Sequence, residues 1–264
     1  LLAVGVKYAL TSYEKWRGAD IKKFNSNRYD EFTSVIVDSG LFSYLWGKKS
    51  HINYDRNFYY TYLDNYSKFI EASRFENMRY VELDVQQKLG VDFAWELRER
   101  LVDRFGKSKI INVAHEIDGD ASKLIEYADY LALGVNTRIK KYGIGYYYKY
   151  VDYVYAMAKR HNTKIHLLGA TRPADVRLCY GATSCDSTSW LAKLMWGCYN
   201  NHNYFHGKGG HLDIRSTGQL IELMDAVEKE HNITLGSVPT EKQYYYAAYT
   251  AFLYYKQLMP NSVT

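Results

Sequence analysis

The chain is poor in cysteine and proline and has no long apolar run. Only three of its 264 residues are Cys and three are Pro. Cys179, Cys185 and Cys198 form an odd set without paired spacing, which argues against a secreted disulfide framework. No segment approaches the roughly 20 apolar residues of a membrane span, and the start lacks the features of a signal peptide. We expect a cytoplasmic protein with no membrane partner.

Charge is nearly balanced, with a formal net charge of +5, so composition permits a polyanionic partner without requiring one. Tyrosine is the abundant residue, at 28 of 264. Tyrosines suit wet interfaces and stacking on bases. The alternative is that they replace Phe and Leu on half-buried helix faces.

Short aliphatic runs recur along the first 190 residues, and nearly all are continuous rather than alternating. Continuous apolar runs are typical of strands buried on both faces of a parallel sheet. The expected strands are Leu2–Val6, Ser34–Val37, Arg79–Leu83, Lys109–Val113, Tyr130–Leu133, Lys164–Leu168 and Ala182–Cys185.

Amphipathic stretches separate most of these runs. We expect helices over Asp92–Phe105, ended by Gly106, and over Asp120–Tyr127 and Tyr146–Arg160. With room for an eighth strand near Leu212–Arg215, the pattern predicts an α/β fold, a single (β/α)₈ barrel of the TIM type over residues 1–264. An open doubly wound sheet is the alternative, but no Gly-rich phosphate loop follows the first run.

Carboxylates and small residues occupy the carboxyl ends of the expected strands, where (β/α)₈ barrels have their active sites. These residues are Asp38, Asp84, His115 with Glu116, Gly134, Gly169 and Asp186. Each Asp alone could be a helix N-cap. Three carboxylates in one pocket instead suit displacement at an anomeric carbon. Burial and like charge push their pKa values apart, so one can stay ionised as a nucleophile while another carries a proton. The spacing of strands and carboxylates alone therefore predicts a barrel with a carboxylate site that suits glycosyl chemistry.

Five segments, in collinear order, resemble the tRNA-guanine transglycosylase superfamily. They are Val37-Asp-Ser-Gly-Leu-Phe-Ser43, Val81-Glu-Leu-Asp84, Ala132-Leu-Gly-Val135, His166-Leu-Leu-Gly-Ala170 and Ser184-Cys-Asp-Ser-Thr-Ser-Trp190. The cysteine-rich zinc motif of the tRNA enzymes is absent from this sequence. The chain therefore looks most like the phage DNA-guanine transglycosylases, which insert 7-deazaguanines into DNA. tRNA remains the alternative substrate, and a phage origin would place the protein in the host cytoplasm.

The resemblance implies a role for each residue of the site. Asp186 would attack C1′ and expel guanine, and Asp38 would be the general acid and base. Asp84 would accept from the N–H edge of the base. The base pocket would further include Ser39, Ser43, His115, Gly134 and Val135, with His115 at a position where the family usually has Gln.

Partners follow from the same resemblance. They are DNA or tRNA, guanine as the leaving base, and an incoming 7-deazaguanine such as 7-cyano-7-deazaguanine (preQ0); whether the protein forms a homodimer stays open. Phosphate contacts are expected from basic residues shortly after strand ends, and Tyr146-Tyr-Tyr148 either stacks on bases or begins a helix. The basic residues are Lys48, Lys49, Arg138, Lys140 and Lys141.

We expect no required cofactor. Cys198, His202, His206 and His211 have the ligand types and the count for zinc, but their spacing matches no family pattern. Two other functions compete with the transglycosylase: a non-catalytic nucleic-acid-binding relative, and a barrel glycosidase. The glycosidase is disfavoured because the strand ends offer Asp and Gly rather than the Trp and Glu of a carbohydrate cleft.

Overall fold

A computed structural model describes residues 7–45, 54–115, 121–134, 143–169 and 181–186, together with residues 198–199, 202–203 and 229. The chain divides into two compact units. Unit 2 comprises Val4–Asp186 and Leu2, and unit 1 comprises Ser187–Thr264 with Leu1 and Ala3. Most described residues belong to unit 2, and each unit is considered by itself.

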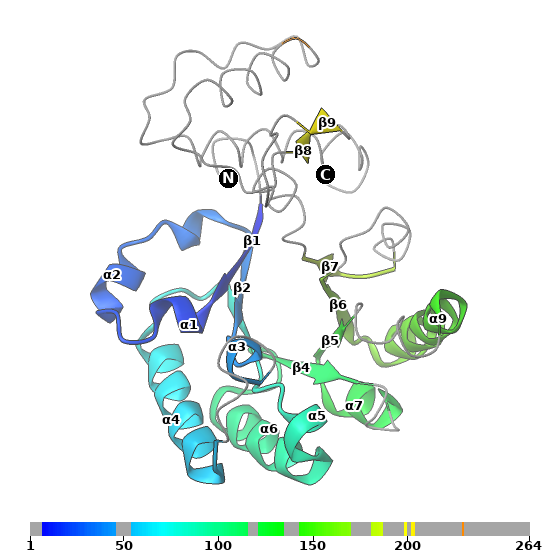
Figure 1. The fold of residues 1–264 in the computed structure, drawn as a ribbon, viewed down its shortest axis with the longest axis horizontal. Helices are drawn as coiled ribbons and strands as arrows, with labels where there is room; N and C mark the ends of the chain where they lie inside the picture. Colours follow the sequence, from blue (N-terminus) through cyan, green and yellow to red (C-terminus); the bar gives the residue numbers. More distant parts are fainter. Residues whose placement is uncertain are drawn as a thin grey trace. The chain divides into compact units, whose positions relative to one another are not determined.

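Unit 2 is an α/β structure built on one parallel sheet. Its seven strands are hydrogen-bonded in chain order from β1 to β7, and every pairing is parallel. The sheet curls, and helices cover its convex side (Figure 1). Within the described residues β1 and β7 do not pair, so the sheet is a half-barrel. The strands are β1 (Tyr8–Ser12), β2 (Ser34–Asp38), β3 (Met78–Val81), β4 (Ile110–Ala114), β5 (Tyr130–Gly134), β6 (Lys164–Leu168) and β7 (Ser184–Cys185).

The connections between strands hold the helices that a parallel sheet requires. Their bounds are α1 (Tyr13–Trp16), α2 (Ile21–Asn25), the 3₁₀ turn η2 (Tyr29–Glu31), α3 (Phe42–Leu45), α4 (Arg56–Ala72), α5 (Gln86–Leu89), α6 (Val91–Phe105), α7 (Ala121–Tyr127) and α9 (Ile144–His161). Side-chain caps set two of the starts: Asp20 accepts from Lys22 N and Asp55 from Phe58 N. Gly106, at φ +83°, ends α6 as predicted.

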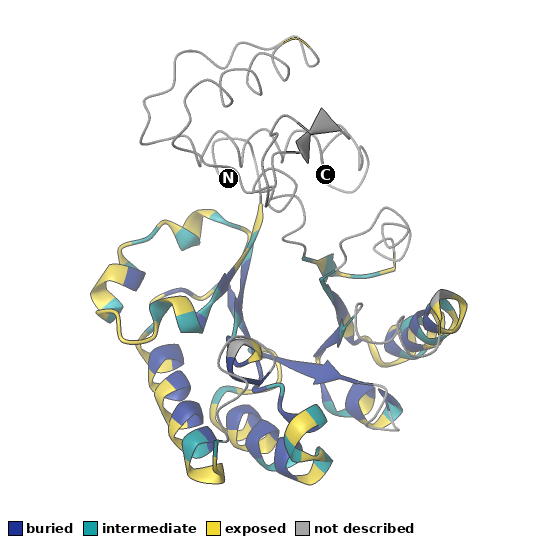
Figure 2. Ribbon diagram, in the orientation of Figure 1, coloured by how far each residue is buried: buried dark blue, intermediate teal, exposed yellow. Residues whose placement is uncertain are grey.

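Apolar side chains fill both faces of the sheet. Two clusters combine strand residues with helices, such as Val37 with Tyr66 of α4, and Leu167 with Val154 of α9. A third cluster draws on strands alone, including Ile36, Val113 and others on the concave side. Figure 2 shows the buried strands and the buried faces of the helices against them. Burial on both faces explains the continuous apolar runs in the sequence.

Strands β2 to β6 confirm five predicted runs to within two residues at each end, and β7 covers the end of the sixth. The run Leu2–Val6 lies outside the described residues. The first strand that the structure describes, Tyr8–Ser12, is one that the sequence pattern did not predict. The three predicted helices are present as α6, α7 and α9. The expected eighth strand, Leu212–Arg215, lies outside the described residues, so the closed barrel and the single domain stay predictions.

Tyrosine serves largely as a core residue in this unit. Tyr13, Tyr62 and Tyr66 are at most 4% exposed, and the ring of Tyr13 contacts the rings of both other residues. In α9, Tyr147 is buried and Tyr146 is half exposed, so the Tyr146–Tyr148 run lies within a helix. The half-buried helix face therefore accounts for many of the tyrosines.

Unit 1 has few described residues. They include β8 (Cys198–Tyr199) and β9 (His202–Asn203), which pair antiparallel. Across the part of the chain that the structure describes, no helix combines the length and apolarity needed to cross a membrane.

A candidate active site at the carboxyl ends of the strands

The period of two along the strands places three of the predicted site residues, Asp38, His115 and Asp186, on one side of the sheet. Ile36 and Val113 belong to the strand-only cluster on the concave side. Side chains two residues apart on a strand share a face, so Asp38 and His115 follow them onto that side. By the same period of two, Asp186 lies on the same side of the sheet as Ser184. Parallel strands bring these positions together at their common carboxyl edge.

Asp38 is the most perturbed carboxyl group of this edge. Burial, reinforced by the nearby carboxylates of Asp186 and Asp84 and opposed by the Gly40 N–H and His166, raises the pKa of Asp38 from 3.8 to about 6. The Gly40 N–H donates to Asp38 Oδ1 at 2.6 Å. Carboxylates that perturb one another electrostatically lie within one site, so the fold brings the three aspartates together.

Asp84 does not cap a helix. The N-cap of α5 is Val85, which makes no side-chain cap hydrogen bond. Asp84 Oδ1 lies instead 2.7 Å from His115 Nε2, and Gln87 Nε2 lies 2.7 Å from His115 Nδ1. Because the amide nitrogen can only donate, Nδ1 accepts and the ring carries its hydrogen on Nε2, which donates to Asp84. Gln87 thus sets the tautomer of His115, and His115 orients Asp84.

Asp186 follows β7 and is one-fifth exposed. Its Oδ1 accepts from the Gly169 N–H at 2.9 Å and lies 3.2 Å from Nε2 of His166, whose side chain is only 1% exposed. The backbone N–H of Asp186 donates to Leu167 O at 3.1 Å, which continues the ladder between β6 and β7. Backbone contacts therefore hold this carboxylate over the end of β6.

The strand ends beneath Asp38 and Asp84 are tied together by helix α4. The hydroxyl of Tyr66, which is fully buried, lies 3.1 Å from both Val37 O and Val81 O. Burial raises the pKa of Tyr66 well above its usual value, so the group remains a hydrogen-bond donor. A single side chain thus bridges β2 and β3 near their carboxyl ends.

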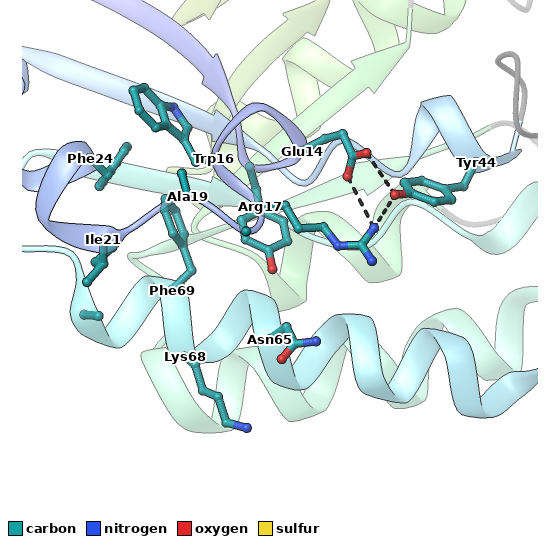
Figure 3. A pocket seen from close by; sticks show the side chains of 13 residues that line it. Glu14, Trp16, Arg17, Ala19, Ile21, Phe24, Tyr44, Asn65, Lys68 and Phe69 are labelled. Carbon is teal, nitrogen blue, oxygen red and sulfur yellow. Dashed lines mark hydrogen bonds and ion pairs between the residues drawn. The ribbon is translucent and has the colours of Figure 1, made fainter.

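The segment after Asp38 is held by close packing. Gly40 has φ +78°, and a Cβ there would lie 2.5 Å from Glu14 Cβ. Tyr44 of α3 donates to Glu14 Oε1 at 2.8 Å, and Arg17 contacts both Tyr44 and Glu14 (Figure 3). These contacts anchor the loop that follows the first aspartate.

Glu14, Arg17 and Tyr44 form the polar wall of a pocket of about 810 Å³ between the α1–α2 segment and α4 (Figure 3). Trp16, Phe24 and Phe69 line its apolar side. None of the three aspartates lines it. The pocket is therefore separate from the three aspartates at the strand ends.

Three residues that the sequence reading did not assign to the site belong to its surroundings. Phe42 in α3 is 70% exposed, four residues after Asp38. Gln87 contacts His115, and Ser184 contacts His166. An apolar residue in a family-like segment could have marked Phe42, but partners across strands leave no signal in the sequence.

The remaining predicted site residues are only partly described. Ser39 is buried, and its carbonyl accepts from the Tyr62 hydroxyl at 2.6 Å; Gly134 ends β5. Ser43 lies in α3, but its side chain is outside the described part. Also outside the described residues are Lys48, Lys49, Glu116, Val135, Arg138, Lys140, Lys141, His206 and His211. Among the described residues, no cluster of His, Cys, Asp and Glu side chains could hold a metal ion.

No protein-family model matches this sequence, and no curated protein matches it significantly. The arrangement of the described side chains is therefore the structural basis for inferring a function.

Proposed function

We propose that the protein is a guanine transglycosylase that exchanges guanine in DNA for a 7-deazaguanine of the preQ0 type. The observation that carries the proposal is the group of three aspartates that follow β2, β3 and β7 and interact electrostatically, one of them with a pKa of about 6. A group that titrates near neutral pH can give and take a proton during turnover. Its neighbours are carboxylates, which suit attack on an oxocarbenium-like centre.

The proposed reaction runs through two displacements at C1′. Asp186 attacks C1′ as the bond to guanine N9 breaks, and the departing base takes the proton of Asp38. The incoming 7-deazaguanine gives a proton to Asp38 and displaces the Asp186 carboxylate. Two inversions at one carbon retain the anomeric configuration. In a duplex, C1′ is accessible to the nucleophile only after the nucleotide leaves the stack, so we expect base flipping.

Asp84 and its neighbours supply base recognition in this proposal. The His115 N–H occupies one side of Asp84 Oδ1, and the other carboxylate oxygen is available for the N–H edge of a purine. Phe42 exposes its ring beside the loop that follows Asp38, where a flat heterocycle could stack. A base held by stacking and by one carboxylate edge presents its glycosidic bond to the other two carboxylates.

The proposal also includes closure of the sheet into a (β/α)₈ barrel. Seven parallel strands curl with a filled concave side, and one further strand between β7 and β1 would close a (β/α)₈ barrel. The predicted strand Leu212–Arg215 would occupy that place.

The test is nucleoside mass spectrometry on duplex DNA and on tRNA, each incubated with the protein and preQ0. We expect modified deoxyguanosine in the DNA, no modification by Asp186→Ala, and full modification by Asp103→Ala, which removes an exposed carboxylate from α6. Modification of tRNA alone would support the proposed chemistry but refute DNA as the substrate. Nucleic-acid binding without exchange on either substrate would support a non-catalytic binding protein and refute the enzyme.

A further inference from the structure

A chain of polar side chains crosses three strands beneath Asp186. The Tyr130 hydroxyl of β5 lies 2.6 Å from Ser184 Oγ of β7, and Ser184 Oγ lies 2.6 Å from His166 Nδ1 of β6. The other ring nitrogen, Nε2, lies 3.2 Å from Asp186 Oδ1. The strand register places these residues side by side, because His166 is paired with Ser184.

His166 is an unusual residue for this place in the sheet. Its side chain is 1% exposed, and its Nε2 makes no hydrogen bond of good geometry, although the nitrogen faces Asp186 at ion-pair distance. Buried polar atoms in native proteins nearly always have a partner, so an exception calls for an explanation. The catalytic scheme proposed above uses neither His166 nor Ser184.

The direction of the hydrogen bonds follows from the charge at one end. A lone pair of Nε2 aimed at a carboxylate oxygen would be repelled, whereas an N–H is attracted. A neutral ring with its hydrogen on Nε2 accepts at Nδ1, so Ser184 donates to His166 and accepts from Tyr130. Burial raises the pKa of the Tyr130 hydroxyl, which therefore keeps its proton and remains a donor.

We propose that His166 is a positioning residue for Asp186, with its Nε2–H form selected by the Tyr130–Ser184 relay. The Gly169 N–H and the His166 Nε2–H both approach Oδ1 of the carboxylate. Oδ2 is then the oxygen presented to substrate. In the proposed reaction, on which this last step rests, the Oδ2–C1′ bond forms as the C1′–N9 bond breaks, and the electron pair and the Asp38 proton leave with guanine.

The other charged groups around His166 agree with this role. Asp38 of β2 interacts with His166 electrostatically, Asp186 faces its Nε2, and the hydroxyls of Tyr130 and Ser184 lie on its Nδ1 side. Ala132, its register partner on β5, contributes no polar side chain. The ring thus has the Asp186 carboxylate at Nε2 and the Ser184 hydroxyl at Nδ1.

The first test needs no substrate. In protein labelled with ¹⁵N-histidine, the His166 resonances are those lost in His166→Gln, and they are read in the neutral form reached by raising the pH. We expect the Nε2–H tautomer in the wild type and a mixture of tautomers in Ser184→Ala. The matched control is Thr183→Ala, which removes the hydroxyl that accepts from Ile165 N and leaves the tautomer unchanged. An Nδ1–H tautomer in the wild type, or no change in Ser184→Ala, overturns the relay.

The second test measures the catalytic consequence in single-turnover formation of the covalent adduct. Loss of one neutral hydrogen bond predicts that Ser184→Ala slows this step between about twofold and tenfold, with KM for the incoming base unchanged. Because Ser184 acts through His166, Ser184→Ala should have no further effect in the His166→Gln background. Additive effects, or a rate loss matched by a lower unfolding temperature, would refute a positioning role. A wild type that forms no adduct refutes the proposed function, while the tautomer measurement still decides the relay.

Discussion

Replacement of Asp38 by Asn should stabilise the fold in a way that depends on pH. In the folded state the pKa of Asp38 is raised from 3.8 to about 6, chiefly by burial. The unfolded chain therefore gives up this proton at lower pH than the native protein does. Between about pH 4 and pH 6 the native state binds more protons, so Asp38 makes stability fall as pH rises through that range.

The size of the effect comes from the same shift. A rise from 3.8 to about 6 is roughly two pKa units, and at 1.36 kcal/mol per unit this corresponds to about 3 kcal/mol above pH 6. Asn keeps an oxygen that can accept from the Gly40 N–H but has no charge to bury. Asp38→Asn should thus unfold like the wild type near pH 4 and be up to about 3 kcal/mol more stable at pH 8.

Denaturant unfolding at pH 4, 6 and 8 measures this difference. Asp103→Asn, which changes the same side chain at an exposed position of α6, should track the wild type at all three pH values. A stability difference for Asp38→Asn that is equal at pH 4 and pH 8 would refute the reasoning. The variant should also lose base exchange, because an amide cannot carry the proton.

Three further predictions follow from the described contacts. Gly40→Ala should cost about 2 kcal/mol or more, because it combines φ +78° with a Cβ 2.5 Å from Glu14 Cβ, whereas Gly18→Ala, at φ +80° with no atom within 4 Å, isolates the backbone strain; equal losses in denaturant unfolding would contradict the clash. Glu82→Gln should cost about 3–5 kcal/mol by urea unfolding, because Arg98 would remain buried without its ion pair, against less than about 1 kcal/mol for Glu31→Gln at the exposed Arg28 pair. Phe42→Ala should leave the unfolding temperature unchanged and raise KM for nucleic acid about tenfold or more, by loss of stacking; an equal rise in Tyr153→Ala, which is exposed on α9, would show that Phe42 is not special.

Most of the described strands could be predicted from the sequence, because a strand buried on both faces has a continuous run of apolar residues. Continuous runs such as Lys164–Leu168 became β6 without a change of bounds. The first described strand was missed for the opposite reason. Tyr8 and Leu10 in β1 are 59% and 41% exposed in this structure, and the segment Tyr8–Ser12 ends in polar residues. A half-exposed edge strand has no continuous apolar run for the pattern to detect.

The residues of the candidate site could be predicted only in part, because spacing along one strand does not reveal hydrogen-bond partners on other strands and helices. The strand ends identified Asp38, Asp84 and Asp186, and the fold brings them together. The tautomer of His115 is set by Gln87, which lies in helix α5 after the previous strand, β3. Glu82 is the opposite case: it lies two residues before Asp84 but is paired with Arg98 of α6 in the core. Because β3 ends at Val81, the period of two does not extend from Glu82 to Asp84, and the two acids have different partners, Arg98 in the core and His115 at the strand ends.

Three chemically identical side chains differ here because each has a different partner. Asp38 accepts one backbone N–H, and its burial together with two nearby carboxylates raises its pKa to about 6, so it is the carboxyl group that titrates near neutral pH. Asp84 receives the ring N–H of His115, which restrains the orientation of its carboxylate. Asp186 is held through Oδ1 by Gly169 and faces His166. In the proposed base exchange at C1′, these groups would act as a proton carrier, an oriented acceptor and a nucleophile with one open oxygen, and we expect a change of each partner to impair one role without the others.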